Sequence, residues 1–186
     1  WEGRYQSNNV PWDAGSITTP IKEFIDSLPD KSAHILVPGA GNAYEFEYLF
    51  NQGFTNSYVL DIAPSPLANV KQRMPGLQAH HLIYADFFTI TAQYDIVIEQ
   101  TFFCALDPAR REDYAIKMHE ILKPGGILAG LLFNFPLTEQ GPPFGGSSEE
   151  YKNLFAPYFD IALMEPARNS IRPREGKELF IILKKK

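Results

Sequence analysis

The order of strand-like and helical segments constrains the fold of this 186-residue chain more than any other feature. Short apolar runs typical of strands alternate with segments of helical periodicity, and the chain ends with two strands and no helix between them. The predicted strands are 34–38, 58–60, 82–83, 94–99, 127–135, 159–164 and 178–183. The predicted helices are 20–28, 44–52, 64–74, 108–122 and one that begins at Ser147 or Ser148.

This order predicts an α/β fold with a seven-stranded, mostly parallel sheet and helices on both faces. The last two strands must form an antiparallel hairpin, because a parallel crossover needs a dozen or more residues and an element inside it. A doubly wound sheet that ends in such a hairpin resembles the Rossmann-like class I methyltransferases, although a fold alone does not give a function. The length fits one domain, 1–186, in which residues 1–18 lack periodicity and would form an aromatic lid segment.

Composition excludes several classes of protein. A net charge of -5 disfavours a nucleic-acid partner, which would need a basic face. The single cysteine excludes a disulfide framework and a multi-cysteine zinc site. No apolar run approaches the roughly 20 residues of a membrane span, and no signal peptide is visible, so we expect a cytoplasmic protein without a membrane partner. Because the chain begins at Trp1, we expect some N-terminal residues to be missing.

A glycine-rich turn follows the first predicted strand. Gly39-Ala40-Gly41 lies directly before a predicted helix, where glycine lets the backbone approach a ligand and the helix N-terminus offers free N–H groups. A dinucleotide site would have a third glycine at position 44, but this residue is Tyr44. The turn therefore predicts a ligand without a pyrophosphate and disfavours an NAD(P) oxidoreductase.

Two acids follow the next two predicted strands. Asp61 lies 20 residues after Gly41, as expected of an acid that bonds ribose hydroxyls. Asp86, followed by Phe87, is suited to hold and cover an adenine. Taken singly, each feature is more often a tight turn or a helix cap. Since ligands of open α/β sheets bind at the carboxyl ends of the strands, the three features together predict a nucleoside site.

Aromatic residues occur in the first 18 residues without a periodicity that would bury them. Trp1, Tyr5 and Trp12 could pack in the core, or they could cover a cationic ligand. A cation is attracted to each ring face by about 0.5–2 kcal/mol. In the second case the segment would also exclude water that solvates an attacking nucleophile.

These and other motifs resemble the thiopurine S-methyltransferase family, most closely its halide and thiol methyltransferase branch, from Trp1 to the last strand. The loop 101–106 and the Gly-Pro-Pro-aromatic motif 141–144 are the specific pieces. The remaining motifs are Trp1-Glu2-x-Arg4-Tyr5, Val10-Pro11-Trp12-Asp13-x-Gly15, Val37-Pro38-Gly39-Ala40-Gly41, Leu60-Asp61-Ile62, Asp86-Phe87-Phe88, Leu122-Lys123-Pro124-Gly125-Gly126 and Arg172-Pro173-Arg174-x-Gly176-Lys177-Glu178.

The resemblance implies S-adenosyl-L-methionine as cofactor, S-adenosyl-L-homocysteine as product, and no metal. It places the glycines under the methionine part, Asp61 at the ribose and Asp86 with Phe87 at the adenine. The implied cofactor-binding residues are Trp1, Tyr5, Trp12, Gly39, Gly41, Asp61, Ile62, Asp86, Phe87 and Gln100. Gln100 departs from the family, since the plant-like enzymes have Tyr there and the thiopurine enzymes Arg. A neutral amide cannot act as a base or a charge clamp.

The expected reaction is an in-line transfer of a methyl group to a small thiol or soft anion: thiol, bisulfide, thiocyanate or halide. No residue is identified as certainly catalytic. Candidates for the acceptor pocket are Phe102, Phe103, Phe144, Arg172 and Arg174. Cys104 is expected to be a packing residue, because no activating partner is evident. We expect a small-molecule acceptor as partner and a monomer or weak homodimer. The alternatives are an O- or N-methyltransferase of another small molecule and a non-catalytic S-adenosylmethionine-binding protein.

Overall fold

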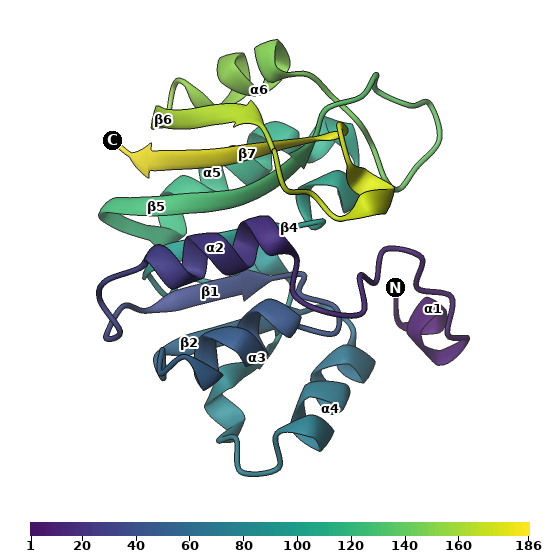
Figure 1. Ribbon diagram of the computed structural model, residues 1–186, viewed down its shortest axis with the longest axis vertical. Coiled ribbons are helices and arrows are strands. Elements are labelled where there is room, and N and C mark those ends of the chain that lie inside the picture. The colour runs from purple at the N-terminus through teal and green to yellow at the C-terminus, as the bar shows by residue number, and fades with distance from the viewer.

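The computed structural model describes residues 1–186 and confirms a seven-stranded sheet, in the order β3-β2-β1-β4-β5-β7-β6 (Figure 1). The strands are β1 (Ile35–Pro38), β2 (Ser57–Asp61), β3 (Leu82–Tyr84), β4 (Tyr94–Gln100), β5 (Leu122–Phe133), β6 (Phe159–Pro166) and β7 (Glu178–Lys185). The α-helices are α1 (Glu2–Gln6), α2 (Thr19–Ser27), α3 (Tyr44–Asn51), α4 (Pro64–Arg73), α5 (Arg111–Ile121) and α6 (Ser148–Phe155). Short 3-10 helices are η1 (Ala79–His81), η2 (Phe87–Thr89), η3 (Phe103–Ala105), η4 (Pro108–Arg110) and η5 (Arg172–Arg174).

Strands β1 to β5 run parallel, and β7 lies antiparallel between β5 and β6. The predicted C-terminal hairpin is thus confirmed. The fifth strand begins at Leu122 rather than at residue 127 as expected. Its register against β4 shifts between Tyr94 and Ile96, so the Lys-Pro-Gly-Gly segment forms an irregularity within the strand instead of a separate turn.

Helices cover both faces of the sheet, each over its own apolar core. On one face α2, α3 and α4 bury Ile21, Phe46 and Val70 against β1 and β2. On the other face α5 and α6 bury Tyr114 and Phe155 against β4 and β5. No helix is both long and apolar enough to cross a membrane.

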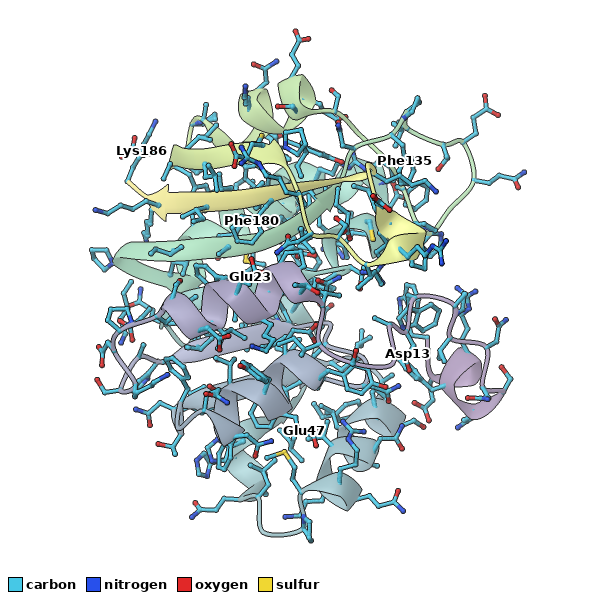
Figure 2. All side chains as sticks on the ribbon, viewed as in Figure 1. Asp13, Glu23, Glu47, Phe135, Phe180 and Lys186 are labelled. Atoms are coloured by element: carbon cyan, nitrogen blue, oxygen red, sulfur yellow. The ribbon has the colours of Figure 1, made fainter.

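The first helix, α1, was not expected, because five residues are too few to show helical periodicity. It lies beside α4 at the edge where the parallel strands end (Figure 1). The carboxylate of Glu2 accepts from the backbone N–H of Ser65 at 3.1 Å and from its hydroxyl, which caps the start of α4. Figure 2 shows Asp13 and Phe135 toward this same edge, and Lys186 at the opposite edge.

Candidate functional site

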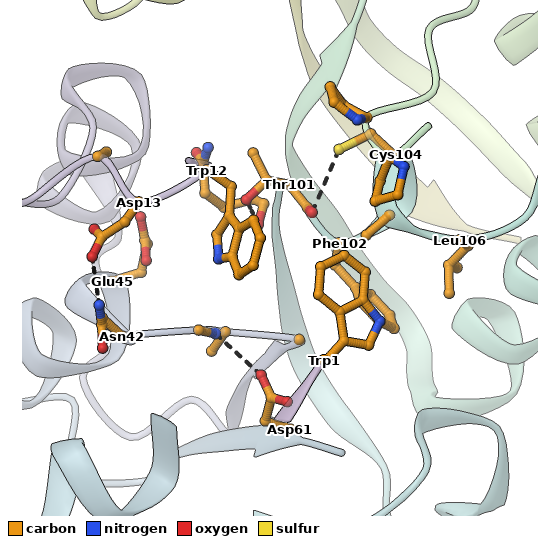
Figure 3. Close-up of a pocket in the computed structure, with 18 of the residues that line it drawn as sticks. Trp1, Trp12, Asp13, Asn42, Glu45, Asp61, Thr101, Phe102, Cys104 and Leu106 are labelled. Carbon is orange, nitrogen blue, oxygen red and sulfur yellow. Dashed lines mark hydrogen bonds between the residues drawn. The ribbon is translucent and has the colours of Figure 1, made fainter. Parts of the chain in front are cut away.

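A cavity of about 680 Å³ opens at the carboxyl ends of the parallel strands (Figure 3). The structure brings to it every residue that the sequence proposed for the cofactor, namely Trp1, Tyr5, Trp12, Gly39, Gly41, Asp61, Ile62, Asp86, Phe87 and Gln100. Of the acceptor candidates, it brings Phe102 and Arg174 to the cavity.

The glycine turn after β1 is shaped by both conformation and crowding. Gly39 and Gly41 have φ values of +56° and +53°, a region that favours glycine. A Cβ atom at Gly39 would lie 2.2 Å from the Phe102 ring, and one at Gly41 would lie 3.2 Å from the Tyr5 hydroxyl. The turn therefore leaves room for a ligand only because both positions lack side chains.

Asp61 ties the ends of β1 and β2 together. Its Oδ2 accepts from the backbone N–H of Gly41 at 3.2 Å, drawn as a dashed line in Figure 3, and its Oδ1 accepts from that of Ala63 at 2.8 Å. The side chain is buried, and burial raises the pKa of its carboxyl group while the backbone donors lower it. Since a carboxylate has about four acceptor positions, both oxygens can also accept from ligand hydroxyls.

The residues proposed for the adenine differ in exposure. Asp86 is exposed and caps η2 through Oδ1, which accepts from the backbone N–H of Phe88 at 3.0 Å. Its other oxygen remains available to an amino group. Phe87 lines the cavity, but its ring is only 2% exposed and packs edge-on against Phe102 at 5.1 Å. It therefore also supports the cavity wall from within the core.

The N-terminal segment forms an aromatic cluster centred on Trp12. Edge-to-face contacts join the Trp12 ring to Trp1 at 5.2 Å and to Tyr5 at 5.6 Å. The guanidinium of Arg4 lies 4.8 Å from the Trp12 ring centroid, a cation–π distance. Arg174 fixes the cluster to the C-terminal part of the chain by donating from Nη2 to the Trp12 carbonyl at 2.7 Å.

A buried glutamate supports the loop that follows β4. Glu99 is 0% exposed, and its Oε1 accepts from the backbone N–H groups of Phe102 and Phe103 at 2.8 and 2.9 Å. Its Oε2 accepts from the Tyr114 hydroxyl at 2.6 Å. Burial raises the pKa of this carboxyl group to about 7, against the lowering by its three donors. Glu99 thus fixes the loop without lining the cavity.

Three of the acceptor candidates lie outside the cavity lining, which corrects their predicted place. Phe103 is 1% exposed and packs in the core against Tyr114 at 4.9 Å. The ring of Phe144 packs on Gly141, where a Cβ atom would lie 2.7 Å from it. Arg172 is exposed on η5, and its side chain forms no hydrogen bond with a residue that lines the cavity.

Other lining residues were not identified from the sequence. They include Thr18, Glu45, Cys104, Phe133, Phe135, Pro142, Pro143 and Lys177. Glu45 follows the glycine turn by four residues, and Cys104, Pro142, Pro143 and Lys177 lie in motifs that were recognised, so a signal was present for these five. Cys104 donates from Sγ to the Thr101 carbonyl at 3.4 Å, and burial raises the pKa of its thiol, so it stays protonated.

The sequence matches a known family along nearly its whole length. Residues 1–181 match the model of the family described as thiopurine S-methyltransferase. A protein from Arabidopsis thaliana named probable thiol methyltransferase 2 is 30% identical over 186 residues, covering 96% of this chain and 81% of that protein. A thiopurine S-methyltransferase from Vibrio parahaemolyticus is 40% identical over 195 residues, covering 96% and 90%.

Solved structures confirm the fold. The 1,6-didemethyltoxoflavin-N1-methyltransferase of Burkholderia thailandensis, determined with its substrate and S-adenosylhomocysteine, superposes with a TM-score of 0.76. The superposition covers 98% of this chain and 84% of the Burkholderia enzyme, and the two sequences are 18% identical. A similar enzyme, a TehB-like S-adenosylmethionine-dependent methyltransferase from Corynebacterium glutamicum, superposes with a TM-score of 0.69 at 17% identity, covering 99% and 96%.

Proposed function

Because the chain belongs to the thiopurine S-methyltransferase family and is an S-adenosylmethionine-dependent methyltransferase, we propose that it methylates a small thiol or soft anion. The acceptor would bind beside the loop that follows β4, between Phe102 and η5. The cofactor would occupy the side formed by the turns after β1, β2 and β3.

One observation carries this proposal: the loop after β4, the segment 133–143 and η5, which form the acceptor side, contribute no His, Asp or Glu to the lining of the cavity. Its one thiol, Cys104, is held protonated by burial. Alcohols and most amines carry a proton that must leave during transfer, whereas thiolates, bisulfide, thiocyanate and halides are nucleophilic without a base.

The remaining side chains suit such an acceptor. Phe102, Phe133 and Phe135 give an apolar wall that strips water from the nucleophile, and this raises its reactivity. Lys177 lies on the same side, forms no ion pair and supplies positive charge that attracts an anion, whereas the charge of Arg174 faces the buried Glu178 at 3.6 Å. When bound, S-adenosylmethionine supplies an electrophilic methyl group on its sulfonium. The protein's contribution is then to align the two reactants and exclude water.

The proposal is tested by a panel of acceptors. We expect turnover with bisulfide, thiocyanate, iodide and a small thiol, with methylated product formed in equal amount to S-adenosylhomocysteine. The control panel holds an alcohol, a phenol and an amine at the same concentrations. Faster methylation of an oxygen or nitrogen acceptor would overturn the soft-anion assignment. Cofactor binding without turnover of any acceptor would favour a binding protein.

A further inference from the structure

Phe135, which follows the end of β5 (Figure 2), is the one residue that lines both the cavity and a second, smaller pocket. The second pocket has a volume of about 330 Å³ and is formed by the segment that follows β5 and by the start of α6. Pro136 and Leu137 give it apolar surface, and Asn134 and Glu150 give it polar groups. Because the two linings share no other residue, this single side chain separates the two spaces.

The ring of Phe135 is held in place by two contacts. It packs on Gly145 so closely that a Cβ atom at that position would lie 2.4 Å from Cδ2 of the ring. It also contacts the ring of Phe133, with 5.1 Å between the two ring centroids. The first contact depends on glycine, because any side chain at position 145 would displace the ring.

The backbone around this ring is fixed as well. The N–H of Gly146 donates to the carbonyl of Phe135 at 2.8 Å. Nη2 of the buried Arg111 donates to the carbonyl of Gly145 at 2.6 Å, so the residue on which the ring packs is tied to the start of α5. The ring therefore has a defined position, and this position limits the space open to a ligand.

Phe135 lies on the side of the cavity assigned above to the acceptor. It shares this side with Phe102 and Lys177, whereas the turns after β1, β2 and β3 form the side assigned to the cofactor. An acceptor whose sulfur faces the cofactor must place the rest of its structure toward the wall that contains Phe135.

We propose that Phe135 determines the specificity for the acceptor. Its ring limits the protein to compact thiols and soft anions, and it excludes thiols long enough to reach the second pocket. The inference rests on the proposed function, because it needs the acceptor to bind on this side of the cavity.

The effect of the ring on specificity should be large. Protein interiors are close-packed, so a ligand atom that overlaps a fixed ring forces side chains out of their preferred conformations. In an apolar pocket a single methylene group changes kcat/KM by about 10–200-fold. A whole fused ring on the acceptor should therefore be discriminated at least as strongly.

The experiment compares benzenethiol with 2-naphthalenethiol, two acceptors that share the same nucleophile and differ by one fused ring. In the wild type kcat/KM should be at least about 10-fold lower for 2-naphthalenethiol. Phe135→Ala should remove this difference, because the cavity and the second pocket then join. General damage to the fold would lower kcat/KM for both thiols alike and leave their ratio unchanged. The affinity of Phe135→Ala for S-adenosylhomocysteine, measured by calorimetry, should equal that of the wild type.

Leu137→Ala is the matched control, since Leu137 is exposed and lines only the second pocket. Alone, it should leave the ratio of kcat/KM for the two thiols unchanged. Added to Phe135→Ala, it should lower kcat/KM for 2-naphthalenethiol about 3-fold and leave benzenethiol unchanged, because only the longer thiol then reaches this apolar contact.

Two results would overturn the role of Phe135. One is equal kcat/KM of the wild type for both thiols, a comparison that needs no variant to fold. The other is a ratio in Phe135→Ala that equals the ratio in the wild type. Failure of the wild type with every thiol and soft anion would instead overturn the proposed function.

Discussion

The two sides of the cavity differ in how the chain builds them. The cofactor side consists of turns that directly follow β1, β2 and β3, with the N-terminal segment over them. The acceptor side combines the loop after β4, the segment 133–143 and η5, which lie far apart in sequence. A site made of strand ends can be located from the chain order alone, because parallel strands deliver their carboxyl ends to one edge. A site made of distant loops depends on packing that no local pattern encodes.

The largest expected effect is on the cofactor side. Asp61→Ala removes a carboxylate proposed to accept from both ribose hydroxyls and also frees the N–H groups of Gly41 and Ala63. Since hydrogen bonds to charged groups contribute about 1.5–3 kcal/mol each, affinity for S-adenosylhomocysteine should fall about 1,000-fold. Calorimetry measures this. Asp61→Asn should lose less affinity for S-adenosylhomocysteine than Asp61→Ala. A small loss of affinity in Asp61→Ala would show that Asp61 does not bind the ribose.

The next largest effect is on the free energy of unfolding. It comes from Glu99, the residue that supports the loop after β4 on the acceptor side. The pKa of Glu99 is raised to about 7 in the folded protein from an ordinary value of 4.5, so folding favours the protonated form. The contribution of Glu99 to the stability of the folded protein is therefore fully present below pH 4.5 and is lost as the pH rises through about 7. This loss amounts to roughly 3 kcal/mol of the free energy of unfolding.

Urea unfolding of the wild type and Glu99→Gln between pH 4.5 and 8 tests this expectation. The variant does not titrate at this position, so its stability relative to the wild type should increase with pH. The exposed Glu149→Gln serves as a control for general charge effects. Parallel pH dependence of the wild type and Glu99→Gln would show that Glu99 stays ionised across this range.

A smaller effect on the cofactor side should be a difference between the affinities for S-adenosylmethionine and for S-adenosylhomocysteine. Trp12→Leu removes a ring face while keeping the backbone carbonyl that binds Arg174. S-Adenosylmethionine carries a sulfonium charge and S-adenosylhomocysteine does not, so only the former loses a cation–π contact. Its affinity should fall about 10-fold more than that of the product. Equal losses for the two ligands would leave Trp12 with a packing role alone, and Trp12→Phe should retain part of the preference.

The smallest effect should be confined to the acceptor side. Lys177 is exposed, lines the cavity and forms no ion pair with a carboxylate. Lys177→Met should raise the KM for anionic acceptors about 3-fold at low salt, because an exposed charge is screened by solvent and ions. Its affinity for S-adenosylhomocysteine should not change, and Lys152→Met, outside the cavity, should change neither. An equal rise in KM for a neutral acceptor would contradict an electrostatic role.

The difference between strand-end turns and distant loops also explains which parts of the fold and the site could be predicted from the sequence. The seven strands and the C-terminal hairpin were predictable from local patterns, as was a serine cap of α6, although the sequence left Ser147 and Ser148 open and the structure assigns Ser147. The helix α1 was missed because its five residues are too few to show helical periodicity, and its position beside α4 depends on the contact between Glu2 and Ser65. Phe103 and Phe144, which lie in the motifs 101–106 and 141–144, were placed in the acceptor pocket because a sequence does not show which way an aromatic ring points. In the structure Glu99 binds the backbone N–H of Phe103, and the ring of Phe144 packs on Gly141. Sequence spacing reveals neither contact.

Cofactor binding in the cavity is tested most directly by calorimetric titration of the wild-type chain with S-adenosylhomocysteine, with NADH as the control. The glycine turn without a third glycine, and Asp61 beside it, predict one molecule of S-adenosylhomocysteine per chain and no heat with NADH. Binding of NADH at the same site, or no binding of S-adenosylhomocysteine by the folded chain, would show that this cavity is not the site of S-adenosylmethionine.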